Sequence, residues 1–487
     1  MRLGLILPAL LLIAGPASAQ DPAPGRGDPD IVLTGDVTRD GHQTYIELPF
    51  DVPEGTARIT VEFDYDAGDA RATLDLGLLD PNGFRGWSGG NKSGFVVAET
   101  FATPSYLPGP VEPGEWAVLL GAPFIAEDAT VVYEARIWLD EAPGALTQPV
   151  RGGGGWLRGD FHAHTGHSDG YCPNASGERA PCPVHKTVEA AREAGLDFIA
   201  ITDHNTVSHF AEMNALQAYY DDITLISGVE VTTFFGHANI FGATDFTEFR
   251  LTSAGDAEAL FASAAARGAV ASINHPALPS GEACMGCGWT GPTEGAVAVE
   301  AVNGANARRF GVENSPVSGV RYWEARLNEG ARATAIGGSD NHDAADVAGQ
   351  NQSPIGAPTT VVWAENASVA AILDGVRTGR VFIDLADDRN WWIDLTATSG
   401  DSRTIMGSVL SVEAGDAVVI EAAGAGPEGA AVEFIGPVSV LATAPLEDAR
   451  LELAIDETTT WVRANLRTRD GAIALISNPI YFEIAAP

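Results

Sequence analysis

Basic residues and cysteines are scarce in this chain of 487 residues. It contains 28 lysines and arginines against 65 aspartates and glutamates, which gives a formal net charge of −37. A surface this acidic repels nucleic acid and anionic membranes, so we expect neither as a partner. Long apolar runs are also lacking, because nothing after residue 14 approaches the roughly 20 apolar residues of a membrane-spanning helix. We therefore expect no membrane span.

The apolar run that opens the chain, Leu3 to Ala14, is itself too short to cross a membrane. It follows a basic residue, Arg2, and precedes the small residues Ala17-Ser18-Ala19. This order is typical of a secretory signal peptide. We expect residues 1–19 to be such a peptide, cleaved after Ala19, and the mature protein to be periplasmic or secreted from a bacterium.

The four cysteines lie in segments whose composition predicts loops: Cys172, Cys182, Cys284 and Cys287. In an oxidising compartment cysteines form disulfides by default, and four cysteines allow three pairings. We expect pairs between cysteines that are close in sequence. The alternative is a zinc site of four cysteines that includes Cys284-x-x-Cys287.

The chain does contain an ordered series of histidine and carboxylate clusters. In the first, His162 and His164 are two residues apart, so on a strand both imidazoles would face the same side. Six of the ten histidines and four acidic residues belong to the series: His162, His164, Asp169, Asp203, His204, Glu230, His237, His275, Asp340 and His342. A lone His-x-His is weak evidence, but the whole series predicts a metal centre.

Nearly every cluster follows an apolar run that predicts a buried strand. These runs cover residues 156–160, 197–201, 223–229, 269–273 and 333–336. Helical patterns lie between them, at residues 186–194, 209–219, 256–266 and 323–329. The alternation predicts an α/β fold with a parallel sheet or barrel, and polar residues at the carboxyl ends of its strands predict an active site there.

The ordered motifs resemble the PHP (polymerase and histidinol phosphatase) superfamily, and the flanking regions resemble its secreted CehA/McbA-like branch. The resemblance covers residues 150–390. It implies a distorted (β/α)7 barrel that holds two or three divalent metals at its mouth. Mixed imidazole and carboxylate ligands suit Zn²⁺, Mn²⁺ or Fe²⁺, whereas an all-oxygen cage would suit Ca²⁺ or Mg²⁺.

The resemblance also implies which residues hold each metal. One metal would be bound by His162, His164, Glu230 and Asp340. A second would share Glu230 as a bridge and add His237 and His275. A third would be held by His204 and His342, together with Asp169 or His167.

Three residues are candidates for catalytic roles. Glu230 would act as the bridging carboxylate. Asp203 could orient a metal-bound histidine, or could only shape the end of its strand. Asn303 ends the strand Val299-Glu300-Ala301-Val302-Asn303 and could reach the substrate or support a ligand, with a simple turn as the alternative.

The segments on either side of the predicted barrel lack metal-ligand clusters. Residues 28–145 and 391–487 contain short alternating runs separated by Gly and Pro, which predicts an antiparallel β-sandwich in each. Gly152 to Gly155 mark the boundary before the barrel. The expected architecture is therefore a barrel flanked by an N-terminal and a C-terminal β-sandwich.

The leading functional hypothesis is a metal-dependent phosphoesterase that attacks a small-molecule ester with a metal-bound hydroxide. Hydrolysis of a carbamate or a carboxylic ester, as in CehA-like enzymes, is the alternative because the same nucleophile attacks carbonyl carbon. A hypothesis of another class is a non-catalytic metal- or glycan-binding protein. Complete ligand clusters argue against it, because a degenerate barrel would have lost ligands. The sequence leaves the oligomeric state open.

Overall fold

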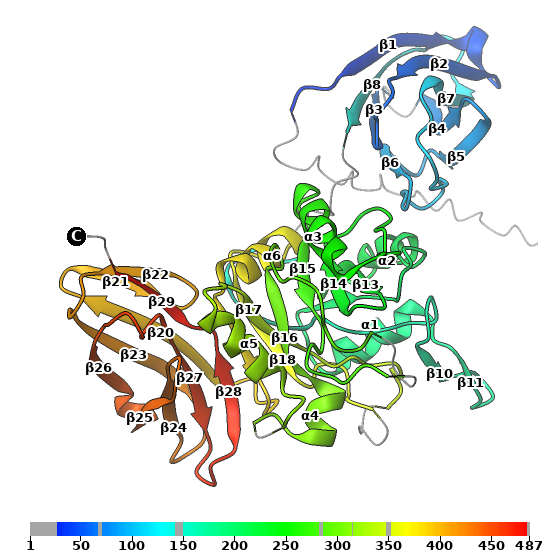
Figure 1. Ribbon diagram of the computed structural model, residues 1–487. Helices are drawn as coiled ribbons and strands as arrows, with labels where there is room; N and C mark the ends of the chain where they lie inside the picture. The colour runs from blue at the N-terminus through cyan, green and yellow to red at the C-terminus, as the bar shows by residue number, and fades with distance from the viewer. Residues whose placement is uncertain are drawn as a thin grey trace, which may run out of the picture. The chain divides into compact units, whose positions relative to one another are not determined.

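The computed structural model describes residues 27–66, 71–141, 150–281, 286–313, 315–346 and 352–484. The expected signal peptide, residues 1–19, lies outside the described residues. The chain divides into two compact units, Met1–Pro143 and Gly144–Pro487, drawn in Figure 1 in blue to cyan and in cyan to red. None of the helices in the described part of the chain has the length and apolarity needed to span a bilayer.

The first unit consists of two antiparallel four-stranded sheets. One sheet has the order β1 (Ile31–Thr38), β8 (Thr130–Asp140), β3 (Arg58–Tyr65), β6 (Gly94–Ala98). The other has the order β2 (Tyr45–Val52), β7 (Gly114–Ile125), β4 (Ala72–Asp80), β5 (Gly83–Gly89). Alternate residues of both sheets, such as Ile59 and Val61 in β3 and Trp116 in β7, are buried in one core. This is the packing expected when one face of each strand is apolar.

The second unit is built on a sheet of 15 strands. Its main path is β17 (Thr334–Gly338), β16 (Ala298–Asn303), β15 (Val270–Ile273), β14 (His237–Phe241), β13 (Thr224–Thr232), β12 (Phe198–Ile201), β9 (Gly155–Asp160), β18 (Thr359–Ala364), β19 (Val381–Asp384), β28 (Ile473–Ser477), β27 (Trp461–Arg467), β24 (Ala431–Ile435) and β25 (Val440–Pro445). Two further strands, β22 (Val409–Val412) and β29 (Ile480–Ile484), attach through β27. Figure 1 shows helices beside the green and yellow part of this sheet.

The expected (β/α)7 barrel is wrong in detail, because the described residues form few helices and mostly sheet. The α-helices are α1 (Val184–Glu193), α2 (Phe210–Gln217), α3 (Ala257–Ala266), α4 (Gly304–Phe310), α5 (Gly319–Asn328) and α6 (Val369–Thr378). Strand β14 runs antiparallel to both β13 and β15. Only residues 233–236 separate β13 from β14, which is too short for the crossover helix that a parallel neighbour requires.

The sheet nevertheless brings the carboxyl ends of β9 and β17 together. Just past these strands, an isolated parallel bridge joins Ala163 to Asn341. The backbone N–H of His164 donates to the carbonyl of Asn341 at 2.9 Å, and that of Asp340 donates to the carbonyl of His162 at 2.8 Å. The first and last of the predicted clusters therefore lie side by side.

The C-terminal strands form two sheets on a common core, as expected for a β-sandwich from residue 391 onward, but this sandwich is continuous with the preceding sheet. Strand β28 pairs with β19, so the sheet continues through the expected boundary. A second sheet, β21 (Ser402–Ile405), β20 (Trp392–Ser399), β23 (Ala417–Ala425) and β26 (Arg450–Ala454), adds to the same core. That core includes Val361 of β18 and Phe382 of β19. The two regions therefore fold as one unit.

Pairing between nearby cysteines is confirmed for Cys172 and Cys182, which form a disulfide. Cys287 is also disulfide-bonded, and Cys284 lies outside the described residues. Because no described cysteine is free, the alternative zinc site of four cysteines is contradicted.

Candidate metal centre

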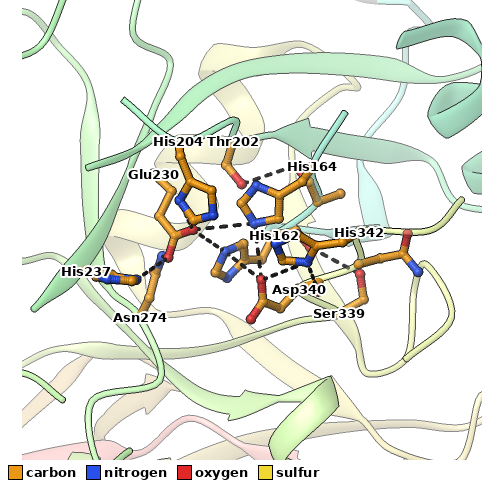
Figure 2. A network of polar contacts seen from close by, with 12 residues as sticks. His162, His164, Thr202, His204, Glu230, His237, Asn274, Ser339, Asp340 and His342 are labelled. Atoms are coloured by element: carbon orange, nitrogen blue, oxygen red, sulfur yellow. Dashed lines mark hydrogen bonds and ion pairs between the residues drawn. The ribbon is translucent and has the colours of Figure 1, made fainter. Parts of the chain in front are cut away.

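The nine predicted metal ligands come from the ends of neighbouring strands in the second unit. They are His162 and His164 after β9, Asp169 in the following loop, His204 after β12, Glu230 in β13, His237 at the start of β14, His275 after β15, and Asp340 and His342 after β17. The structure brings all nine into three adjoining groups, each with donor atoms within 4.8 Å of one another. Figure 2 shows most of these side chains pointing toward one another around Glu230.

The first group consists of His162, His164, Glu230 and Asp340. His162 Nε2 lies 3.1 Å from Glu230 Oε2 and 3.3 Å from Asp340 Oδ1. His164 Nε2 lies 3.4 Å and 3.1 Å from the same two oxygens. Two imidazoles and two carboxylates thus converge on one point, as the resemblance implies for the first metal.

The second group uses the other oxygen of Glu230. His237 Nδ1 and His275 Nε2 each lie 3.3 Å from Glu230 Oε1. One carboxylate therefore faces two groups, Oε2 toward the first and Oε1 toward the second. This is the arrangement that a bridging ligand requires.

The third group consists of His164, Asp169, His204 and His342. Asp169 Oδ1 lies 3.7 Å from His204 Nε2 and 3.4 Å from His342 Nε2. The alternative candidate, His167, instead contacts Ser208 Oγ at 2.7 Å and Glu212 Oε2 at 3.3 Å. Of the two residues considered as ligands of the third metal, Asp169 lies in the third group and His167 does not.

Glu300 in β16 supports the first two groups, and the sequence analysis did not identify it. Its Oε1 accepts a hydrogen bond from His162 Nδ1 at 2.9 Å, which leaves His162 Nε2 directed at Glu230. Its Oε2 accepts from the backbone N–H of His275 at 2.8 Å. A glutamate inside a strand of small and apolar residues is the signal that could have revealed it, because a buried carboxylate needs partners.

Other hydrogen bonds orient the remaining ligands. Asn274 Nδ2 donates to Glu230 Oε1 at 3.0 Å. His275 Nδ1 lies 3.0 Å from the carbonyl of Cys287, and His342 Nδ1 lies 2.9 Å from the carbonyl of Asp340. Since a carbonyl only accepts, each Nδ1 carries a proton, and each Nε2 is the ring nitrogen that faces the ligand groups.

Asp203 and Asn303 do not act in the same way. Asp203 is fully buried and accepts hydrogen bonds from Thr165 N at 2.8 Å and Ser168 Oγ at 2.6 Å. It therefore shapes the loop that carries Asp169, a role that the sequence analysis did not predict for it. Asn303 Nδ2 donates to Asp340 Oδ2 at 3.1 Å, so Asn303 orients a predicted ligand.

Charge balance within the groups governs their protonation. Burial opposes the ionised form of Glu230, yet nearby His162 and His204 hold its pKa well below the ordinary value. Burial likewise opposes the imidazolium of His275, but its contact with Glu230 raises the pKa of His275 to about 9. Burial, reinforced by the nearby His342, lowers the pKa of His164 to about 4. Glu230 is thus ionised at neutral pH, which is the state that binds a cation.

Several ligand atoms of the three groups are buried without a hydrogen bond to any described residue, as expected of atoms that bind a metal. His162 Nε2, Glu230 Oε2 and both ring nitrogens of His237 are buried and make no hydrogen bond within the described residues. Buried polar atoms without a hydrogen bond are rare in native proteins and destabilise the fold. A divalent metal would satisfy them, so these residues fit the cofactor that the resemblance implies.

Backbone strain also concentrates at the groups. His275 and Asp340 have φ values of 28° and 55°, and Asn205, next to His204, has a φ of 52°. Residues other than glycine rarely adopt this left-handed backbone region, and those that do cluster at functional sites. The fold therefore tolerates strain at the positions where the ligands must be aimed.

Comparisons with known proteins add little to this geometry. No family model matches the chain, and no curated protein matches it. Among solved structures, a two-domain protein from Bacteroides vulgatus that contains a predicted PHP-like metal-dependent phosphoesterase is similar over 69% of this chain and 98% of its own, with 18% identity and a TM-score of 0.37. A cyanophage Pam1 capsid chain matches 27% of this chain and all of its own at 22% identity, with a TM-score of 0.14. Both scores are too low to carry an argument.

Proposed function

We propose that this protein is a metal-dependent hydrolase of the PHP type that cleaves a small-molecule phosphate ester. The observation that carries the proposal is Glu230, whose two oxygens face separate ligand groups. The unpaired buried donors around it support the same conclusion. The disulfide between Cys172 and Cys182 supports activity outside the cytosol, because such bonds persist in oxidising compartments.

The chain's own residues would hold and orient the metals. His162, His164 and Asp340 would bind one ion, His237 and His275 a second, and Glu230 would bridge them. His204, His342 and Asp169 would bind a third. Bound Zn²⁺, Mn²⁺ or Fe²⁺ would supply Lewis acidity and an acidified water for attack on the ester. Glu300 would keep the lone pair of His162 Nε2 directed into the site.

A competing mechanism would use Ser208 as a covalent nucleophile. Its Oγ lies 2.7 Å from His167 Nδ1, and His167 Nε2 lies 3.3 Å from Glu212. A serine, a histidine and a carboxylate in contact are the parts of an activated nucleophile. We do not assign this role, because Ser208 is exposed.

The test is an activity screen of the metal-loaded protein on nitrophenyl esters of phosphoric, carboxylic and carbamic acids. We expect phosphate ester hydrolysis that a chelator abolishes and added metal restores. Glu230→Gln should reduce turnover by at least about 100-fold, since even residues that only support ligands reduce activity by 10- to 100-fold. Glu428→Gln, at an exposed position, is the matched control and should change nothing.

Single-turnover hydrolysis in isotope-labelled water shows whether the P–O bond is cleaved, and the Ser208→Ala variant separates direct attack by water from a route through phosphoserine. We expect one labelled oxygen in the released phosphate and unchanged activity in Ser208→Ala. Trapping of a phosphorylated serine would overturn direct attack by water. Activity confined to carboxylic esters or carbamates would instead replace the proposed substrate class with the alternative one.

A further inference from the structure

A short disulfide-closed hairpin follows directly after Asp169. Its strands are β10 (Tyr171–Pro173) and β11 (Arg179–Pro181), with three paired residues each. A two-stranded hairpin of this size is marginally stable on its own. The disulfide between Cys172 and Cys182 closes its base, and both cysteines are buried.

The base of the hairpin is hydrogen-bonded to the loop that carries Asp169. Gly166 N donates to the carbonyl of Cys182 at 2.7 Å, and Cys182 N donates to the carbonyl of Gly170 at 3.1 Å. Asp169 lies between these two anchor points. Its side chain is 59% exposed, so surrounding packing does little to hold it.

The same hairpin also contacts another ligand of the third group. Tyr171 N donates to the carbonyl of His342 at 2.8 Å, and Tyr171 pairs with Asp343 in an isolated bridge. By contrast, the first two groups are held by Glu300 and Asn274, which belong to other parts of the fold. The hairpin thus contacts His342 and the loop that carries Asp169, two ligands that belong to the third group alone, whereas His164, shared with the first group, is held by the carbonyl of Asn341.

We propose that the Cys172–Cys182 disulfide positions Asp169 and His342, and that it sets the metal affinity of the third group alone. This inference rests on the proposed metal-dependent function. The disulfide removes the hairpin's freedom, the hairpin fixes the backbone on both sides of Asp169, and the carbonyl of His342 is fixed by Tyr171. Without the crosslink the third group loses its alignment while the other two keep theirs.

The experiment uses the full chain with both cysteines replaced, Cys172→Ser and Cys182→Ser, and measures bound Mn²⁺ and Zn²⁺ by elemental analysis and competitive titration. We expect one metal position to weaken by on the order of 10- to 100-fold, the usual effect of losing a residue that orients a ligand. The other positions should keep the affinity of the parent protein. Unchanged affinity at every position would overturn the inference, as would equal weakening of all of them.

A second variant covers failure of the first to fold. In Gly166→Ala the disulfide is kept, but the added Cβ would lie 2.7 Å from Cys182 N and Pro181 C, so the loop must move away from the hairpin. We expect the same selective weakening. Gly152→Ala is the control, because its Cβ would contact nothing within 4 Å. Selective loss only in Asp169→Asn, with Gly166→Ala unaffected, would overturn the role of the hairpin.

Metal binding by the parent protein distinguishes a failure of this inference from a failure of the proposed function. If the parent binds no divalent metal, the proposed function fails. If the parent binds metal at all three groups and the hairpin variants bind it equally well, only the inference fails.

Discussion

At the residue scale, Glu300 shows how one buried carboxylate can organise two ligand groups. It is 2% exposed and accepts from the side chain of His162 and from the backbone of His275. Asn303 Nδ2 also donates to it, at 3.2 Å, while contacting Asp340. Glu300 thus links three predicted ligands without being one itself.

We predict that Glu300→Gln weakens metal binding by about 10- to 100-fold, the range measured for residues that orient metal ligands. The amide keeps the size of the side chain but loses the charge that holds the proton on His162 Nδ1. Competitive chelator titration measures the change, and Glu457→Gln at an exposed position is the control. Equal affinities in the two variants would mean that Glu300 is only a packing residue.

Most of the predicted ligands could be found from sequence because they follow an apolar run. Strands β9, β12 and β15 begin and end within a residue of the runs that predicted them. Glu300 and Asn274 could not be assigned roles in this way. Their roles depend on which side chains of distant strands they meet, such as His162, which is 138 residues from Glu300.

At the element scale, the prediction of strands was better than the prediction of their directions. The run that predicted β13 did not reveal the hairpin to β14, because an apolar run is the same whether its strand is parallel or antiparallel. The length of the turn at residues 233–236 distinguishes the two directions, because a parallel neighbour would need a longer crossover connection. The distorted (β/α)7 barrel was expected from the resemblance, and the short turn between β13 and β14 is the feature that departs from it.

The side chain of Thr360 in β18 hydrogen-bonds to the backbone of β17. Thr360 Oγ1 donates to the carbonyl of Gly337 and accepts from its N–H, both at 2.7 Å. We predict that Thr360→Val lowers the free energy of unfolding by about 1 to 3 kcal/mol for each backbone group left unpaired. Denaturant unfolding measures this loss, with Thr398→Val, half-buried on β20, as the control. Equal stability of the two variants would show that water replaces the hydroxyl.

At the scale of the whole molecule, the C-terminal strands complete the unit that carries the metal centre. Asn478 Oδ1 accepts from Ala335 N at 2.7 Å, and Asn478 Nδ2 donates to the carbonyls of Ala335 and Val381 at 2.9 Å each. Strand β17, which leads to Asp340, is thereby fixed by a residue near the end of the chain. Composition alone could not show this, because both regions read as β-rich segments with cores of their own.

We predict that a fragment of residues 144–487 folds and binds as much divalent metal per chain as the full protein, because the three ligand groups lie between residues 162 and 342 and the first unit has its own core. A fragment of residues 150–390 should instead aggregate or lose metal, since it exposes β19 and unpairs the backbone of Ala335. Elemental analysis and circular dichroism on both fragments measure the difference. A well-folded shorter fragment with full metal content would show that the C-terminal strands are dispensable. Loss of metal from a well-folded longer fragment would assign a ligand to the first unit.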